Sequence, residues 1–132
     1  MKLKDRVAIV AGGTKGIGLV IALYFARVGA KVVIGGRDAG TGAAGVEQIE
    51  KAGGEALFVT CDVAEMADLD AIVETAVERF GRLDIYVANA GINDPDKTNF
   101  LEITPGQYDR IMDVNLKGMF FGGQKAARQM IR

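Results

Sequence analysis

The stretch AGGTKGIG, residues 11–18, places four glycines among eight residues, directly behind the apolar run VAIV at residues 7–10. Apolar side chains then recur at the spacing of one helix face, at Ile17, Val20, Ile21, Tyr24, Phe25 and Val28. Gly29 ends this helix because glycine adopts the left-handed conformation at little cost. A second apolar run follows at residues 31–34. This order of strand, glycine turn, helix and strand predicts a parallel βαβ unit.

The rest of the chain repeats this alternation. Strands are expected at residues 56–60 and 83–88, and helices at about 41–52, 69–80 and 105–113. A last helical stripe is expected at Leu116, Phe120, Gly123, Ala127 and Met130. Right-handed crossovers would put the helices on both faces of the sheet. The sequence therefore predicts an α/β fold: a doubly wound, Rossmann-type parallel sheet, truncated after about four strands.

Composition limits the classes of partner. The 132 residues are 49% hydrophobic, enough for one domain, and the net charge of −1 gives no attraction to nucleic acid or to an anionic membrane. One cysteine and no histidine exclude a disulfide framework and the common zinc clusters, so no metal site is expected. The apolar run near the start is too short for a signal peptide core or a membrane span. We expect a cytoplasmic protein with a small-molecule partner.

The glycine turn has a chemical interpretation. A helix that begins directly after such a turn leaves backbone N–H groups unpaired, and the positive end of its dipole favours a pyrophosphate. The spacing is Gly12-x-x-x-Gly16-x-Gly18, and Lys15 precedes its glycine, which is not the order of a P-loop. The turn is therefore expected to bind a dinucleotide, with a turn that serves packing alone as the alternative.

Three further motifs accompany the glycines: Asp62 after the third strand, Asn89-Ala90-Gly91 after the fourth, and Asp113-Val114-Asn115. Taken together, the four motifs resemble the short-chain dehydrogenase/reductase family over the whole chain. Two positions depart from the family pattern, since Ala11 replaces a threonine and Ala88 replaces the first of two asparagines. These departures remove hydrogen-bonding side chains from the two turns.

The resemblance implies a role for each matched residue. Asp62 and Val63 would meet the adenine of the cofactor, and Asn115 would belong to the catalytic proton network. The residues expected along the remainder of the cofactor are Gly12, Thr14, Lys15, Gly16, Ile17 and Gly18 in the glycine turn, and Asn89, Ala90 and Gly91 on the ribose side. The alternatives are that Asp62 caps a helix and that Asn89 only forms a turn.

The end of the second strand, GGRD at residues 35–38, predicts NADP as the cofactor in preference to NAD. In the resembled family the position of Gly36 carries the acid that selects NAD. Here Gly36 leaves room, and Arg37 with Lys15 provides two cations for a 2′-phosphate. Asp38 is the residue that favours NAD, and the alternative is that both cations are only solvated.

The catalytic residues of the resembled family are absent. The chain contains no serine, and none of Tyr24, Tyr86 and Tyr108 has a lysine four residues later. We therefore expect residues 1–132 to be the NAD(P)-binding domain, the amino-terminal half of a longer NADP-dependent dehydrogenase or reductase, inactive alone. Its substrate would be a secondary alcohol or a carbonyl compound. The alternative function is a non-catalytic dinucleotide-binding or regulatory module. An exposed edge on the last strand predicts a homo-oligomer or a completing carboxyl-terminal part.

Overall fold

Short apolar runs form the strands, and the glycine-bounded segments between them form the helices. The computed structural model describes residues 1–132. Its strands are β1 (Val7–Ala11), β2 (Lys31–Gly36), β3 (Glu55–Thr60) and β4 (Ile85–Ala88). Its α-helices are α1 (Gly16–Arg27), α2 (Ala39–Lys51), α3 (Met66–Phe80), α4 (Pro105–Met112) and α5 (Gly118–Met130). None of these helices is long and apolar enough to cross a lipid bilayer.

The four strands form one parallel sheet in the order β3-β2-β1-β4. All five residues of β1 are buried, as expected for a central parallel strand covered on both faces. β4 pairs only with β1, so its other edge has no strand beside it. The predicted α/β fold, with four parallel strands and Rossmann-type topology, is confirmed.

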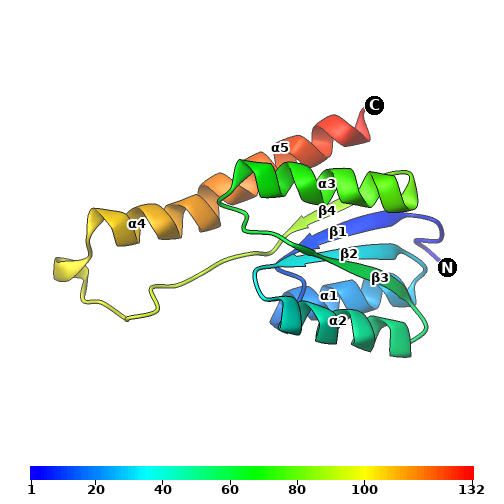
Figure 1. Cartoon of the computed structure of the whole chain (residues 1–132), viewed down its shortest axis with the longest axis horizontal. Helices are drawn as coiled ribbons and strands as arrows, with labels where there is room; N and C mark the ends of the chain where they lie inside the picture. Colours follow the sequence, from blue (N-terminus) through cyan, green and yellow to red (C-terminus); the bar gives the residue numbers. More distant parts are fainter.

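Two helical layers enclose the sheet. In Figure 1, α1 and α2 cover one face, and α3 and α5 cover the other. The α3–α5 side holds the larger core cluster, which includes Ile9, Leu69 and Ile72. The α1–α2 side holds the smaller one, which includes Val10, Ile34 and Ile49. The carboxyl ends of the strands remain open between these layers.

The last helical region follows the predicted stretches and contains a π-helical turn between them. α4, the turn η2 (Asp113–Lys117) and α5 follow one another without a gap. The loop after β4 and a single 3₁₀ turn, η1 (Phe100–Glu102), lead into α4. Figure 1 shows this loop and α4 extending well beyond the sheet.

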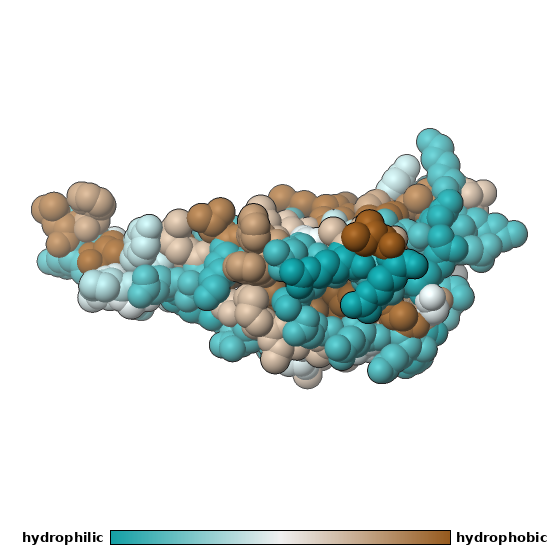
Figure 2. All heavy atoms as spheres, turned by 90° about the horizontal axis from the view of Figure 1, so that it is seen from above, coloured by the Kyte–Doolittle hydropathy of each residue, from teal (hydrophilic) through white to brown (hydrophobic).

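The predicted apolar face of α1 is correct in part, since Ile21 and Phe25 pack against the smaller core cluster, and the predicted apolar face of the last helix is wrong. Ile17, Val20 and Tyr24 are 74%, 65% and 55% exposed, whereas Gly18 and Ala22 are the buried residues of α1. The buried residues of α5 are Gly118, Gly122 and Ala126, whereas Leu116 and Phe120 are exposed. Figure 2, viewed from above the helices α3 and α5, shows hydrophobic side chains at the surface there and at the tip of the α4 segment.

Close backbone approach is the reason for this inversion. A Cβ built on Gly118 would lie 2.7 Å from the carbonyl oxygen of Val63, and one on Gly122 would overlap the hydroxyl of Tyr86. Only small residues allow these helices to reach the sheet and its loops at this distance. Leu116, Met119 and Phe120 therefore lie on the outward face of η2 and α5.

Candidate functional site

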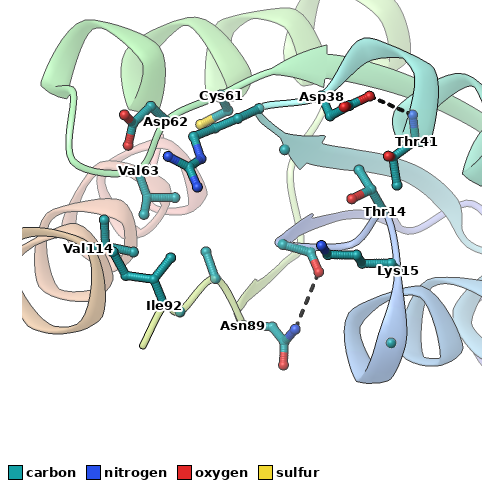
Figure 3. A pocket seen from close by; sticks show the side chains of 16 residues that line it. Thr14, Lys15, Asp38, Thr41, Cys61, Asp62, Val63, Asn89, Ile92 and Val114 are labelled. Carbon is teal, nitrogen blue, oxygen red and sulfur yellow. Dashed lines mark hydrogen bonds between the residues drawn. The ribbon is translucent and has the colours of Figure 1, made fainter. Parts of the chain in front are cut away.

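A cavity of about 410 Å³ lies at the carboxyl ends of the strands. In a parallel α/β sheet this edge is the usual ligand site. The cavity is lined by Gly12, Thr14, Lys15, Gly16, Gly36, Arg37, Asp38, Thr41, Cys61, Asp62, Val63, Asn89, Ala90, Gly91, Ile92 and Val114. Figure 3 shows Asp62, Val63, Val114 and Ile92 toward one end, and Asp38, Thr41, Thr14 and Lys15 toward the other.

The glycine turn is shaped by two close approaches. Gly12 has a φ of +77°, and a Cβ there would lie 2.8 Å from the backbone of Ala90. A Cβ on Gly18 would overlap the carbonyl of Gly12. Gly16 also has a positive φ, +56°, and open space where its side chain would be. The backbone of the turn is thus bare toward the cavity.

The amino end of α1 has no side-chain cap. Its N-cap residue is Lys15, and no side chain accepts a hydrogen bond from the first turn of the helix. The first N–H groups of an α-helix have no acceptor within the helix itself. Gly12, Gly16 and Lys15 place this helix end at the wall of the cavity, where an anion could accept from those groups.

Asn89 joins the last strand to the glycine turn. Its backbone N–H donates to the carbonyl of Ala11 at 3.0 Å, which continues the β1–β4 ladder. Its side-chain Nδ2 donates to the carbonyl of Gly12 at 3.3 Å (Figure 3). The residue is therefore more than a simple turn former, because it fixes the β4 wall of the cavity against the β1 wall.

The end of β2 carries the cation Arg37 and the carboxylate of Asp38, which is already hydrogen-bonded to α2. Arg37 lines the cavity, and Gly36 beside it is small because a Cβ there would lie 2.8 Å from Cγ2 of Thr14. Asp38 is the N-cap of α2, and its Oδ1 accepts the backbone N–H of Thr41 at 2.9 Å (Figure 3). This hydrogen bond lowers the pKa of Asp38 below 3.8.

The end of β3 contributes Cys61, Asp62 and Val63. Oδ1 of Asp62 accepts the backbone N–H of Ala64 at 3.0 Å, which is a local turn contact. The alternative that Asp62 caps a helix is wrong, because Glu65 is the N-cap of α3. Cys61 is buried, and burial raises its pKa to about 12. At neutral pH the Cys61 side chain is therefore a thiol that forms part of the cavity floor.

Asn115 lies beside the cavity and not in its lining. Its Oδ1 accepts the backbone N–H of Ile92 and its Nδ2 donates to the carbonyl of Ile92, both at 2.8 Å. This pair of bonds ties both ends of the side-chain amide to the backbone of Ile92 in the loop that follows β4. Asn115 also lies within η2, the π-helical turn between α4 and α5.

The sequence prediction and the cavity differ at a few residues. Ile17 and Gly18 are outside the lining, since Ile17 is exposed to solvent and Gly18 is buried beneath Gly12. Six residues that line the cavity were not among the predicted site residues: Gly36, Asp38, Thr41, Cys61, Ile92 and Val114. Most of these are adjacent to predicted residues at strand ends, a position that could have indicated them.

Comparison with known proteins identifies the family. Residues 6–132 match the family model described as short chain dehydrogenase. The chain belongs to this family. The family resemblance inferred from the glycine turn, Asp62, Asn89 and Asn115 is therefore confirmed. Short-chain dehydrogenases bind NAD(P).

Curated relatives of the same family are about twice as long. An uncharacterized oxidoreductase from Methylorubrum extorquens is 41% identical over 130 residues, covering 98% of this chain and 52% of the relative. Momilactone A synthase from Oryza sativa subsp. japonica is 38% identical over 129 residues, covering 98% of this chain and 46% of that enzyme. The chain thus spans about half the length of the curated short-chain dehydrogenases it matches.

Solved short-chain dehydrogenases have the same fold. A mutant of the Serratia marcescens short-chain dehydrogenase/reductase superposes with a TM-score of 0.91 at 36% identity, covering 98% of this chain and 53% of that one. A metagenomic short-chain oxidoreductase in complex with NADP superposes with a TM-score of 0.92 at 32% identity, covering 99% and 59%. The fold of this chain is thus that of solved short-chain dehydrogenases.

Proposed function

We propose that this chain binds NADP(H) and supplies the cofactor site of an oxidoreductase that interconverts a secondary alcohol and a carbonyl compound. The observation that carries the proposal is the uncapped amino end of α1, which opens through a bare glycine turn onto the cavity. Backbone N–H groups in that position suit a pyrophosphate. When bound, the nicotinamide supplies or accepts the hydride of the reaction.

The end of β2 supports NADP over NAD. An NAD site presents an acid to the ribose 2′-hydroxyl, whereas Gly36 has no side chain to offer. Arg37 and Lys15 line the cavity and are free to form charge-assisted hydrogen bonds with a 2′-phosphate. Asp38 is committed to capping α2, because its carboxylate accepts the N–H of Thr41. The metagenomic relative in complex with NADP supports the same choice.

We propose that residues 1–132 bind the cofactor without turning it over. Burial raises the pKa of Tyr86 to about 12, which makes this tyrosine a poor proton donor at neutral pH. Tyr24 and Tyr108 are exposed, and neither has a lysine four residues later. Asn115 would then act by holding Ile92 in place, while a further segment or a partner supplies the serine, tyrosine and lysine of the family.

The alternative is a module that binds a dinucleotide for regulation and belongs to no catalytic assembly. An assay of NADPH oxidation with a broad set of ketones and aldehydes separates the two functions. Turnover by an assembly that contains this chain supports the oxidoreductase, and turnover by residues 1–132 alone would contradict both the binding-only module and our proposal of inactivity. The completing partner is proposed to be a second copy or a carboxyl-terminal part, in the cytoplasm.

Cofactor titration tests the proposal directly. Calorimetric titration of the chain with NADP and with NAD should show NADP bound at least about tenfold more tightly, the effect of one charge-assisted hydrogen bond. Arg37→Ala and Lys15→Ala should each weaken NADP binding by about tenfold for the same reason. Arg79→Ala, which removes an exposed cation from α3, is the matched control and should change nothing. Unchanged NADP affinity in both site variants would show that the cofactor assignment is wrong.

A further inference from the structure

Arg110 of α4 forms an ion pair with Asp62 across the edge of the cavity. Its Nη1 lies 3.1 Å from Oδ2 and 3.5 Å from Oδ1 of Asp62, and the two residues are 48 positions apart in the sequence. The Asp62 side chain is 24% exposed and the Arg110 side chain 37% exposed, so water reaches the pair only in part. Arg110 itself does not line the cavity.

The ion pair is one of three contacts along a single helical face. Arg110, Val114 and Gly118 are spaced four residues apart and so lie on the same side of the α4–η2–α5 helix. Val114 is buried in the same core cluster as Val63. Gly118 allows the helix to approach the carbonyl of Val63, as its missing Cβ shows. This face therefore docks along the Asp62–Val63 segment.

Asp62 is held from both sides. From the α3 side, Oδ2 of Asp68 accepts the backbone N–H of Asp62 at 2.9 Å, and the N–H of Ala64 donates to Oδ1 of Asp62. From the other side, Arg110 holds the carboxylate through both oxygens. A carboxylate has about four acceptor positions on its two oxygens. One acceptor position on Oδ2 therefore remains unused.

The position of Asp62 determines which part of a dinucleotide it meets. With the pyrophosphate at α1, after β1, and the ribose phosphate at Arg37, after β2, the base lies after β3 because strands β1, β2 and β3 are consecutive in the sheet. Adenine presents an exocyclic amino group, which is a hydrogen-bond donor. A fixed carboxylate oxygen can accept a hydrogen bond from that amino group. In a base that has a carbonyl at the same position, the carbonyl oxygen and the carboxylate oxygen would both be acceptors and would repel each other.

We propose that Arg110 is a positioning residue for adenine recognition: it orients the carboxylate of Asp62 toward the 6-amino group of the base. The inference rests on the proposed function, since it names a specificity determinant within the same cofactor site. Arg110 acts through Asp62 and touches no reacting atom. It also links base recognition to the helix that carries Asn115, which holds Ile92 at the same end of the cavity.

The test compares NADP with its hypoxanthine analogue, in which a carbonyl replaces the 6-amino group. The wild-type chain should bind NADP about tenfold more tightly than the analogue, the value of one hydrogen bond to a charged acceptor. In Arg110→Gln this ratio should fall to about twofold, mainly through weaker NADP binding. Arg110→Lys keeps the charge without the planar fork and should restore part of the ratio. A purely structural role would weaken both ligands equally and leave the ratio unchanged.

Controls separate the possible failures. Arg79→Gln removes an exposed arginine of α3 that has no ion pair and should keep the wild-type ratio. Asp62→Asn should abolish the preference for NADP over the analogue, and adding Arg110→Gln to it should cause no further loss.

If the wild-type chain binds NADP with the tenfold preference and Arg110→Gln retains it, the role of Arg110 is overturned while the proposed function stands. If the wild-type chain binds neither ligand, the proposed function fails and this inference fails with it. Thermal unfolding of each variant confirms that it folds, and Arg110→Lys provides the answer should Arg110→Gln not fold.

Discussion

Asp84 joins the first and last strands of the sheet at their amino ends. Its Oδ2 accepts the backbone N–H of Val7 at 2.9 Å. Its carboxylate also pairs with Arg82, at a nitrogen–oxygen distance of 2.7 Å, and with Arg6, at 3.4 Å. The hydrogen bond from Arg82 holds the pKa of Asp84 below its ordinary value of 3.8. Since β4 has a neighbour on one side only, this carboxylate is one of few polar groups that hold the strand in place.

Substitution of Asp84 by asparagine should make the stability less dependent on pH. A carboxyl group with a lower pKa in the folded state stabilises the fold above its unfolded pKa, and this contribution is lost as the pH falls through the folded pKa. The Asp84→Asn variant should be less stable than the wild type by about 1 kcal/mol at pH 7, and the difference should disappear as the pH falls from about 5 to about 2. Urea unfolding at several pH values measures this. Glu47→Gln is the control, because Glu47 pairs only with Lys51 on an exposed helix face. A difference that stays constant across this range would contradict the role of Asp84.

The helices pack through glycine and alanine, and this arrangement separates what could be predicted from what could not. Strand positions could be predicted because buried parallel strands are continuous apolar runs, as in β1 and β2. The orientation of α1 and α5 could not be predicted in this way. Gly18 and Gly118 permit the close contact because they have no side chain, and for the same reason they add nothing to a hydrophobic pattern. In the last helix the large side chains gave a helical period but mark the face turned away from the sheet, whereas in α1 Ile21 and Phe25 pack toward it.

The same reasoning applies to the candidate site. The glycine turn, Asp62 and Asn89 could be located because each follows directly after an apolar run. The contact between Arg110 and Asp62 could not be predicted, since it depends on how a helix 48 residues further along docks on the loop after β3. The interaction of Asn115 with Ile92 could not be predicted for the same reason, because it depends on how η2 lies against the loop after β4.

Two glycines of α5 provide a matched test of this packing. Gly118→Ala should destabilise the chain by about 1–3 kcal/mol, because the new methyl group meets the backbone carbonyl of Val63, which cannot move aside. Gly123→Ala should instead stabilise it by about 0.5–1 kcal/mol, since nothing lies within 4 Å of the added Cβ and alanine is the better helix former. Urea unfolding of both variants gives the comparison. Equal effects at the two positions would contradict the close approach of α5 to Val63.

The outward apolar residues leave an exposed hydrophobic patch on the surface of the molecule. On α5 and η2, Leu116, Met119 and Phe120 are 58%, 48% and 64% exposed, and Phe120 stacks edge-to-face on Phe121. The free edge of β4 adds unpaired backbone groups. Exposed apolar patches and free strand edges are typical of surfaces that bind another protein segment. The proposed second copy or carboxyl-terminal part has a surface to occupy here.

Association of the chain should therefore depend on this patch. Sedimentation equilibrium should show a species heavier than the 14.0 kDa monomer, increasing with protein concentration. The Phe120→Glu variant should shift the equilibrium toward monomer, because burying an unpaired carboxylate in an apolar contact is unfavourable. Phe100→Glu changes a phenylalanine that is 88% exposed at the end of the loop before α4, and it should leave association unchanged. A wild-type chain that remains monomeric at every concentration would refute self-association.

The hydrogen bond from Asn89 to Gly12 also determines when the cavity comes into being during protein synthesis. The two residues are 77 positions apart, and the side chain that closes the glycine turn arrives only with the end of β4. A ribosome releases the chain from its amino end, so the first three strands emerge while the turn still lacks its second wall. A dinucleotide bound as proposed would meet the complete turn only once the end of β4 has been synthesised. The stability that such a ligand adds would therefore begin only after Asn89 has left the exit tunnel.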